Sequence, residues 1–176
     1  MPLSRPWYTP TTLQKQRLTP YQREVLLDPG SLTKRMIYMS NNNFSVTVIS
    51  NRWGLASHHE AAALGMLSRQ SVFIREVALC CHGIPFAFAR SLFPVSTLRG
   101  KLGFVRRFGN KSLGQLLFTA PYAVRDSLML CQIPGTDSVI PSQFHQPSPV
   151  WGRCSRFTVT NKPLLVCEYF LAPFQL

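Results

Sequence analysis

Runs of apolar residues separated by turn residues divide the chain into short strands and short helices. The β-branched run at 44–50 predicts a strand. Two apolar runs, 71–81 and 86–94, flank a Gly- and Pro-containing turn at 82–85, which predicts an antiparallel hairpin. Three further strands are expected at 122–132, 151–160 and 163–171, the last two joined as a C-terminal hairpin by a turn at 161–162.

Capping residues mark the helices. Thr19 and Pro20 have the residue types of an N-cap and a first helical position, and the pair Pro29 and Gly30 ends that helix. Further helical segments are expected at 31–36, 57–67, 101–108 and 112–119, the last capped by Ser112. Antiparallel hairpins with helices in two clusters predict the α+β class.

The length of 176 residues suits one domain with a real core. We find no internal repeat and no linker that would divide it. We expect a poorly structured N-terminal segment at 1–18, followed by one domain at 19–176. Within that domain, the proline-rich stretch 133–150 predicts a long, mobile loop.

Composition narrows the class of protein. A hydrophobic content of 45% excludes a disordered chain. No run of about 18 apolar residues is present, so we expect no membrane insertion. The N-terminus lacks the apolar region of a secretory signal. Five cysteines without a C-x-x-C spacing predict reduced thiols, and together these features indicate a cytoplasmic protein.

The charge is strongly positive, with 19 basic and 7 acidic residues and a net charge of +12. Such a balance raises the possibility of a nucleic-acid partner. However, the basic residues are scattered, and no known nucleic-acid-binding motif is present. We therefore expect no nucleic acid, and a positive field that attracts a small anionic substrate.

Glu168 lies in the middle of an otherwise apolar strand. By the two-residue period it shares one face with Leu164, Val166 and Phe170, and the other face is apolar as well. A strand that is apolar on both sides is expected to be covered on both. Because a buried carboxylate costs several kcal/mol unless it is paired, Glu168 needs a partner.

Arg75 presents the same problem with the opposite charge, since its face also carries Val77, Leu79 and Cys81. Two interpretations are open. The simpler one is a cross-strand ion pair between an arginine and a glutamate. The other is a pocket in which the arginine holds a ligand carboxylate and the glutamate accepts a hydrogen bond from a ligand hydroxyl.

Other chemistry finds little support. The histidines His58, His59 and His82, with Cys80 and Cys81, match the spacing of no common metal site, so we expect no metal. The motifs of serine hydrolases, zinc proteases and phosphate-binding loops are absent from the sequence.

A set of motifs in a fixed order resembles the chorismate pyruvate-lyase family, whose members make 4-hydroxybenzoate for bacterial ubiquinone synthesis. The resemblance runs from about residue 19 to the C-terminus. The motifs are SLTKR (31–35), IREV (74–77), FARSLFPVSTL (88–98), SLGQLLF (112–118), RD (125–126), WGRCSRF (151–157) and KPLLVCEYFL (162–171).

The resemblance implies a single α+β domain with an antiparallel sheet and helical flaps that close over an internal site. It implies that chorismate loses its enolpyruvyl group as pyruvate, without metal or organic cofactor. The family's binding arginine and glutamate fall on Arg75 and Glu168. Two further ligand contacts fall on Leu32 and Leu113, and we expect these to act mainly through their backbone. Nothing here requires more than a monomer.

The chain departs from the family pattern in three respects: Leu32 replaces a residue that is often Met, the loop at 133–150 is longer than usual, and the strongly basic balance is unusual. Two alternatives belong to other classes. One is a non-catalytic module that senses a small ligand, because related folds serve in transcription regulators; we expect the segment before residue 19 to be too short for a DNA-binding domain. The other is a basic nucleic-acid-binding protein.

Overall fold

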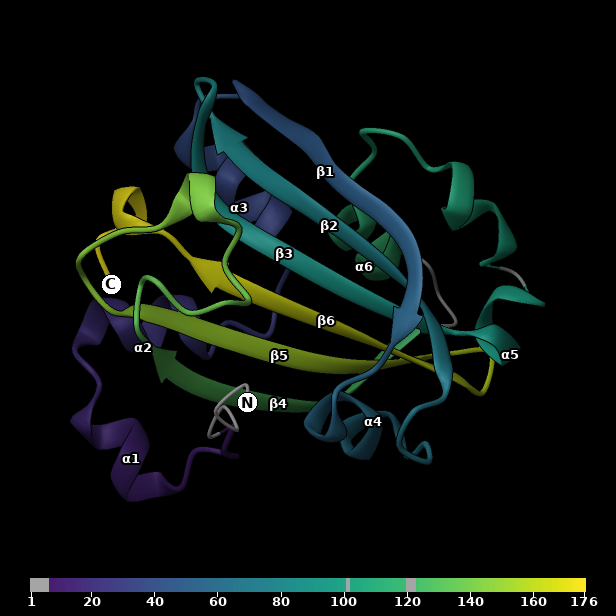
Figure 1. Cartoon of the computed structure of the whole chain (residues 1–176). Coiled ribbons are helices and arrows are strands. Elements are labelled where there is room, and N and C mark those ends of the chain that lie inside the picture. The colour runs from purple at the N-terminus through teal and green to yellow at the C-terminus, as the bar shows by residue number, and fades with distance from the viewer. Residues whose placement is uncertain (1–6, 101, 120–122) are drawn as a thin grey trace.

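The computed structural model describes residues 7–100, 102–119 and 123–176. Six antiparallel strands form one sheet in the order β1-β2-β3-β6-β5-β4 (Figure 1). Neighbours in sequence are mostly neighbours in the sheet, and β6 returns to pair with β3. The predicted α+β class is confirmed. The strands are β1 (Phe44–Leu55), β2 (Ser71–Cys81), β3 (Ile84–Pro94), β4 (Ala123–Ile133), β5 (Val150–Val159) and β6 (Lys162–Phe170).

Two tight turns set the register of the hairpins. His82 and Gly83 have φ angles of 51° and 76°, and Thr160 and Asn161 have φ angles of 49° and 59°. Two consecutive residues with positive φ are typical of a two-residue hairpin turn. The turn predicted at 82–85 contains the observed turn but is two residues too long, and the turn predicted at 161–162 forms one residue earlier, at Thr160 and Asn161. The shift by one residue in the second turn is important, because it places Arg153 opposite Glu168.

The predicted helices form with local differences. A capping box begins two of the predicted helices, at Thr19 and Ser57, and also an unpredicted helix at Thr11. The helix expected at 101–108 is a 3₁₀ helix, η1 (Gly103–Arg107), and residue 101 lies outside the described residues. The others are α1 (Thr12–Arg17), α2 (Pro20–Leu26), α3 (Leu32–Met39), α4 (His58–Leu64), α5 (Val95–Leu98), α6 (Leu113–Thr119), η2 (Ser142–Phe144) and η3 (Ala172–Phe174).

The expectation of a poorly structured segment at 1–18 is wrong for residues 7–18. Helix α1 forms there, and Tyr8 forms an antiparallel bridge to Leu130 of β4 through two backbone hydrogen bonds of 2.9 and 2.8 Å. The first six residues lie outside the described residues.

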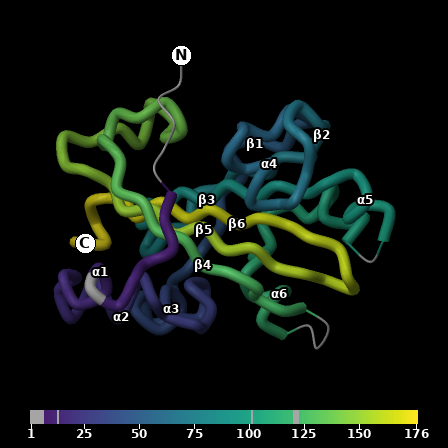
Figure 2. The backbone as a smooth tube through the Cα atoms, turned by 90° about the horizontal axis from the view of Figure 1, so that it is seen from below, coloured from purple at the N-terminus to yellow at the C-terminus, as the bar shows by residue number. Residues whose placement is uncertain are grey.

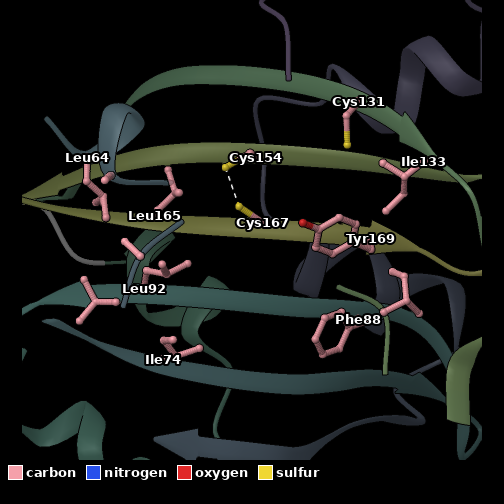
Figure 3. Close-up of a cluster of buried hydrophobic side chains, with 14 of the residues drawn as sticks. Leu64, Ile74, Phe88, Leu92, Cys131, Ile133, Cys154, Leu165, Cys167 and Tyr169 are labelled. Carbon is pink, nitrogen blue, oxygen red and sulfur yellow. Dashed lines mark hydrogen bonds between the residues drawn. The ribbon is translucent and has the colours of Figure 1, made fainter. Parts of the chain in front are cut away.

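The sheet separates two layers. Figure 2 shows α2, α3 and α6 on one side of the sheet, with α4 and the loop after β4 on the other. On the first side, which we call the α6 face, the core contains Phe73, Val77 and Leu164, packed against residues of the covering helices. On the second side, the α4 face, the core contains Phe88, Tyr169 and the facing thiols of Cys154 and Cys167 (Figure 3).

The long loop predicted at 133–150 is shorter and packed against the sheet. Ile133 and Val150 belong to strands, and the residues between them include η2. Ile140 is buried in the core of the α4 face, and Phe144 packs against it. This loop therefore covers the sheet as a helix would, and the expected mobile loop is not what the structure shows.

All five cysteines are buried, and within the described residues none of them is joined in a disulfide. In the part of the chain that the structure describes, no helix has the length and apolar character needed to cross a membrane.

Candidate active site

Arg75 and Glu168 lie on the α6 face in the middle of the sheet. Arg75 is on β2 opposite Ser91 of β3, and Glu168 is on β6 opposite Ala89 of the same strand. Both side chains line one small enclosed cavity, which has a volume of about 30 Å³. Leu113 of α6 also lines it, so the structure brings together three of the four residues expected at the site.

Arg75 is 1% exposed and has no carboxylate partner among the described residues. Its Nη2 donates hydrogen bonds of 2.8 and 2.9 Å to the backbone oxygens of Gly109 and Lys111, and its guanidinium lies 5.6 Å from the centre of the Phe108 ring. Its Nε has no hydrogen-bond partner. Burial lowers the pKa of Arg75, although an arginine side chain remains protonated in proteins. The cavity therefore contains a buried cation with a free donor.

Glu168 does have a side-chain partner, and it is Arg153 rather than Arg75. Arg153 Nε donates a hydrogen bond of 2.7 Å to Glu168 Oε2 across the β5–β6 register. The guanidinium also donates from Nη1 to the backbone oxygen of Val25 at 3.1 Å. The interpretation of Glu168 as half of a cross-strand ion pair is thus confirmed, with a partner that the sequence analysis did not identify.

This ion pair leaves polar atoms without partners. Arg153 is 1% exposed, yet its Nη2 has no hydrogen-bond partner, and neither has Oγ of the neighbouring Ser155. Within the described part of the chain Glu168 accepts a hydrogen bond only at Oε2. Buried donors without partners are rare in folded proteins and point to water or a ligand. Arg153 and Ser155 alternate on β5, so the two-residue period and a correct turn would have placed both beside Glu168.

The two leucines lie at the starts of helices. Leu113 is the first residue of α6 and lines the cavity. Leu32 is the first residue of α3 and is buried in the core, while its neighbour Thr33 lines the cavity. The first N–H groups of a helix have no acceptor within that helix, so both positions offer backbone donors.

A direct contact joins α3 to α6 above the cavity. Thr33 Oγ1 and Ser112 Oγ are 2.6 Å apart, a hydrogen bond in which either hydroxyl can donate. Gly114 allows this approach, because a Cβ atom at that position would lie 2.9 Å from Thr33 Oγ1. The two helices therefore meet over the cavity and close it from that side.

An open groove of about 460 Å³ adjoins the cavity. It lies between the start of β1 and the segment from Phe108 to Thr119, and it shares Val46 and Ser112 with the cavity lining. Lys111 and Asn110 line its rim. The groove is thus the side from which a small molecule would reach the contact between Thr33 and Ser112.

Groups suited to metal binding are not found in the described ranges: no cluster of three or more His, Cys, Asp or Glu side chains is arranged to hold an ion. The histidines at 58 and 59 lie on α4, on the opposite side of the sheet from Arg75 and Glu168.

Comparison with known proteins identifies relatives of this chain. A family model described as chorismate lyase matches residues 1–175. The probable chorismate pyruvate-lyase 2 of Pseudomonas entomophila is 40% identical over 147 residues, which cover 83% of this chain and 77% of that protein. A probable chorismate pyruvate-lyase of Pseudomonas fluorescens is 37% identical over 167 residues, which cover 92% of this chain and 87% of that protein.

Solved structures of similar fold include domains of transcription regulators. The effector domain of PhnF from Mycobacterium smegmatis has a TM-score of 0.58 at 12% identity and covers 82% of this chain and 90% of that domain. The C-terminal domain of a histidine utilization repressor from Pseudomonas syringae has a TM-score of 0.56 at 13% identity, with coverages of 76% and 94%. At these identities the likeness concerns the fold alone.

Proposed function

The chain belongs to the chorismate lyase family, and from this premise we propose that the cavity between Arg75 and Glu168 is where chorismate becomes 4-hydroxybenzoate and pyruvate. The family's product is the aromatic precursor for ubiquinone synthesis. The observation that carries the proposal is the buried guanidinium of Arg75. It has a free Nε and no carboxylate among the described residues, and it lies in the same cavity as Glu168.

Arg75 is the group that binds the ring carboxylate. Chorismate is a dianion, and a buried, uncompensated cation attracts a carboxylate strongly where water is excluded. The free Nε supplies one donor, and the backbone N–H of Leu113 at the start of α6 supplies another. Leu32 contributes its backbone in the same way from α3.

Glu168 receives the opposite end of the substrate. Arg153 fixes its carboxylate through Oε2, which leaves Oε1 to accept a hydrogen bond from the ring hydroxyl. The free Nη2 of Arg153 and the Ser155 hydroxyl lie beside this carboxylate and add donors. Arg153 is thus a positioning residue for Glu168.

The chemistry requires little beyond a fixed geometry. The bond between the ring carbon and the enolpyruvyl oxygen breaks, and this oxygen becomes the keto oxygen of pyruvate. The hydrogen on the ring carbon that carries the hydroxyl passes within the substrate to the enolpyruvyl methylene, which becomes the methyl group of pyruvate. The ring becomes aromatic, which makes the elimination favourable. Holding a reactive conformer in a dry cavity lowers the barrier by several kcal/mol.

The reaction also requires the covering helices to move. Ligand pockets usually have about 300 Å³ or more, whereas this cavity has about 30 Å³. We propose that α3 and α6 act as the two flaps of the site and separate at the contact between Thr33 and Ser112. The adjoining groove is then the route of entry.

We propose that the protein works as a monomer in the cytoplasm. The cavity lining contains both charged groups that the proposed reaction uses, Arg75 and Glu168.

The experiment is to incubate the purified protein with chorismate in the presence of a metal chelator. We expect 4-hydroxybenzoate and pyruvate in equal amounts. Chorismate that stays unchanged would contradict the proposal. Tight binding of 4-hydroxybenzoate without turnover would instead favour the ligand-sensing alternative.

A further inference from the structure

The segment that connects β3 to β4 carries a positive charge that the cavity does not use. Between Glu76 and Asp126 the sequence contains no acidic residue. Over the same stretch it contains these basic residues: Arg90, Arg99, Lys101, Arg106, Arg107, Lys111 and Arg125. Arg99, Arg106 and Arg107 are exposed. They surround η1, on the α6 face of the molecule.

The acidic residues are used elsewhere. Six of the seven form these ion pairs with arginines: Glu24 and Asp28 with Arg35, Glu60 and Glu76 with Arg90, Asp126 with Arg156, and Glu168 with Arg153; the seventh, Asp137, accepts a hydrogen bond from the backbone N–H of Val139. Over residues 7–100, 102–119 and 123–176, no carboxylate pairs with the three exposed arginines around η1. Their charge therefore faces solvent without compensation.

Large apolar side chains are exposed at the same end of the sheet. Trp53 is 51% exposed, Leu55 is 57% exposed and Phe104 is 48% exposed. Trp53 and Leu55 alternate at the end of β1, so both side chains project on the face of Phe73, which is the partner of Trp53 in the strand register. Figure 1 shows the end of β1 and α5 at one end of the sheet.

A shared core anchors these side chains. The Trp53 ring lies 5.6 Å from the Phe73 ring, and Phe73 belongs to the core cluster that contains Leu98 and Val105. The Phe104 ring lies 5.5 Å from the ring of Phe108, a member of the same cluster. The exposed apolar residues and the arginines are thus carried by one packed unit.

We propose that this surface, the η1 patch (Trp53, Leu55, Arg99, Phe104, Arg106 and Arg107), binds the surface of an anionic lipid bilayer. Aromatic side chains favour the interface between water and lipid, and basic residues are attracted to anionic headgroups. Stable adsorption of a protein requires two such signals together. Nucleic acid would use the arginines and the aromatic rings but has no use for the exposed Leu55. The patch adsorbs without crossing the bilayer.

The experiment is co-sedimentation of the full chain with vesicles of phosphatidylglycerol and phosphatidylcholine, compared with vesicles of phosphatidylcholine alone. We expect binding only to the anionic vesicles. Arg106→Glu with Arg107→Glu should lower the partition coefficient at least about 25-fold, since each basic residue near an anionic surface contributes about fivefold. The matched control, Lys15→Glu with Arg17→Glu on α1, changes the net charge equally and should lower binding far less.

A second measurement tests whether the apolar part of the η1 patch contacts the bilayer. The tryptophan emission of the wild type should shift to shorter wavelength with anionic vesicles, and Trp53→Phe should abolish that shift while Trp7 and Trp151 remain. The proposal would be overturned if the wild type did not bind anionic vesicles. It would also be overturned if the two charge-reversal variants lowered the partition coefficient equally. Nucleic acid would be the partner instead if the wild type bound a DNA duplex but not vesicles, and if Arg106→Glu with Arg107→Glu abolished the DNA binding. Turnover of chorismate without vesicles should be the same in all these variants, so a failure of the proposed lyase activity is recognised separately.

Discussion

The two faces of the sheet each bury arginine next to glutamate, but in different ways. On the α4 face, Arg90 donates from Nε to Glu60 at 2.8 Å and from Nη1 to Glu76 at 2.5 Å, and its third nitrogen lies 3.5 Å from Glu60. On the α6 face, Arg153 holds Glu168 while its Nη2 stays without a partner. Arg75, in the same cavity, has a free Nε and no carboxylate within the described residues.

The difference distinguishes a structural network from a binding site. Burial alone would raise the pKa of the Glu60 carboxyl, but the hydrogen bond and charge of Arg90 and the hydrogen bonds from Ser57 outweigh it, and the pKa lies below its ordinary value. Each buried donor left unpaired costs about 1–3 kcal/mol. Such donors are expected at a site where a bound ligand supplies the missing hydrogen-bond acceptor. Both faces use arginine and glutamate, so residue type does not distinguish the structural network from the binding site. The hydrogen-bond partners do.

The largest effect should follow from breaking the complete network. Arg90→Ala leaves the buried carboxylate of Glu60 without its arginine, whereas the half-buried Glu76 keeps Ser50 and Arg52. We expect the free energy of unfolding to fall by about 3–5 kcal/mol, measured by denaturant titration. A loss below about 1 kcal/mol would mean that the pairing on the α4 face contributes no more than a surface ion pair.

Removing Arg75, whose Nε has no hydrogen-bond partner, should affect activity more than stability. In Arg75→Ala no carboxylate loses a partner, but the backbone oxygens of Gly109 and Lys111 lose their donor, so the thermal midpoint should fall less than in Arg90→Ala. The value of kcat/KM should fall about 10²- to 10³-fold, as for the loss of a key electrostatic donor. Steady-state kinetics with chorismate measure this. Near-normal kcat/KM, or a variant that unfolds like Arg90→Ala, would remove the distinction between the two faces.

A smaller effect is expected at the contact that closes the α6 face. Thr33→Val removes the hydroxyl that bonds to Ser112 while keeping the shape of the side chain. A hydrogen bond of this kind contributes about 0.5–1.5 kcal/mol, so release of 4-hydroxybenzoate should become about fivefold faster in stopped-flow experiments. Ser112→Ala removes the same contact and also the hydrogen bond from the backbone N–H of Gln115 to Ser112 Oγ, so release should be at least as fast, and the double variant should add nothing beyond Ser112→Ala. Unchanged release in both variants would show that α3 and α6 do not act as flaps.

Local sequence patterns predicted most of the fold. Capping residues such as Thr19 and Ser112 and the alternation along β2 and β6 gave the elements, because caps and strand periods depend on neighbours in sequence. They also placed Arg75 and Glu168 on covered strands. The predicted mobile loop failed because Ile140 and Phe144 are recruited into the core of the α4 face, a tertiary effect that prolines and serines in the sequence do not reveal.

The partner of Glu168 was missed for a specific reason. A turn at 161–162 would place Ser155 opposite Glu168, whereas the observed turn at Thr160 and Asn161 places Arg153 there. A shift of one residue in a hairpin changes every cross-strand pair. The contact between Thr33 and Ser112 lies beyond any local rule, since it joins helices 79 residues apart in sequence.

The most direct test of the account is a crystal structure of the protein with 4-hydroxybenzoate. The account predicts the ring in an enlarged cavity beneath Leu113, its carboxylate on Nε of Arg75 and its hydroxyl at Glu168, with Arg90 and its two glutamates unchanged. A ligand bound elsewhere, or one that leaves Nε of Arg75 without a partner, would contradict the claim that the incomplete pairing on the α6 face is the active site.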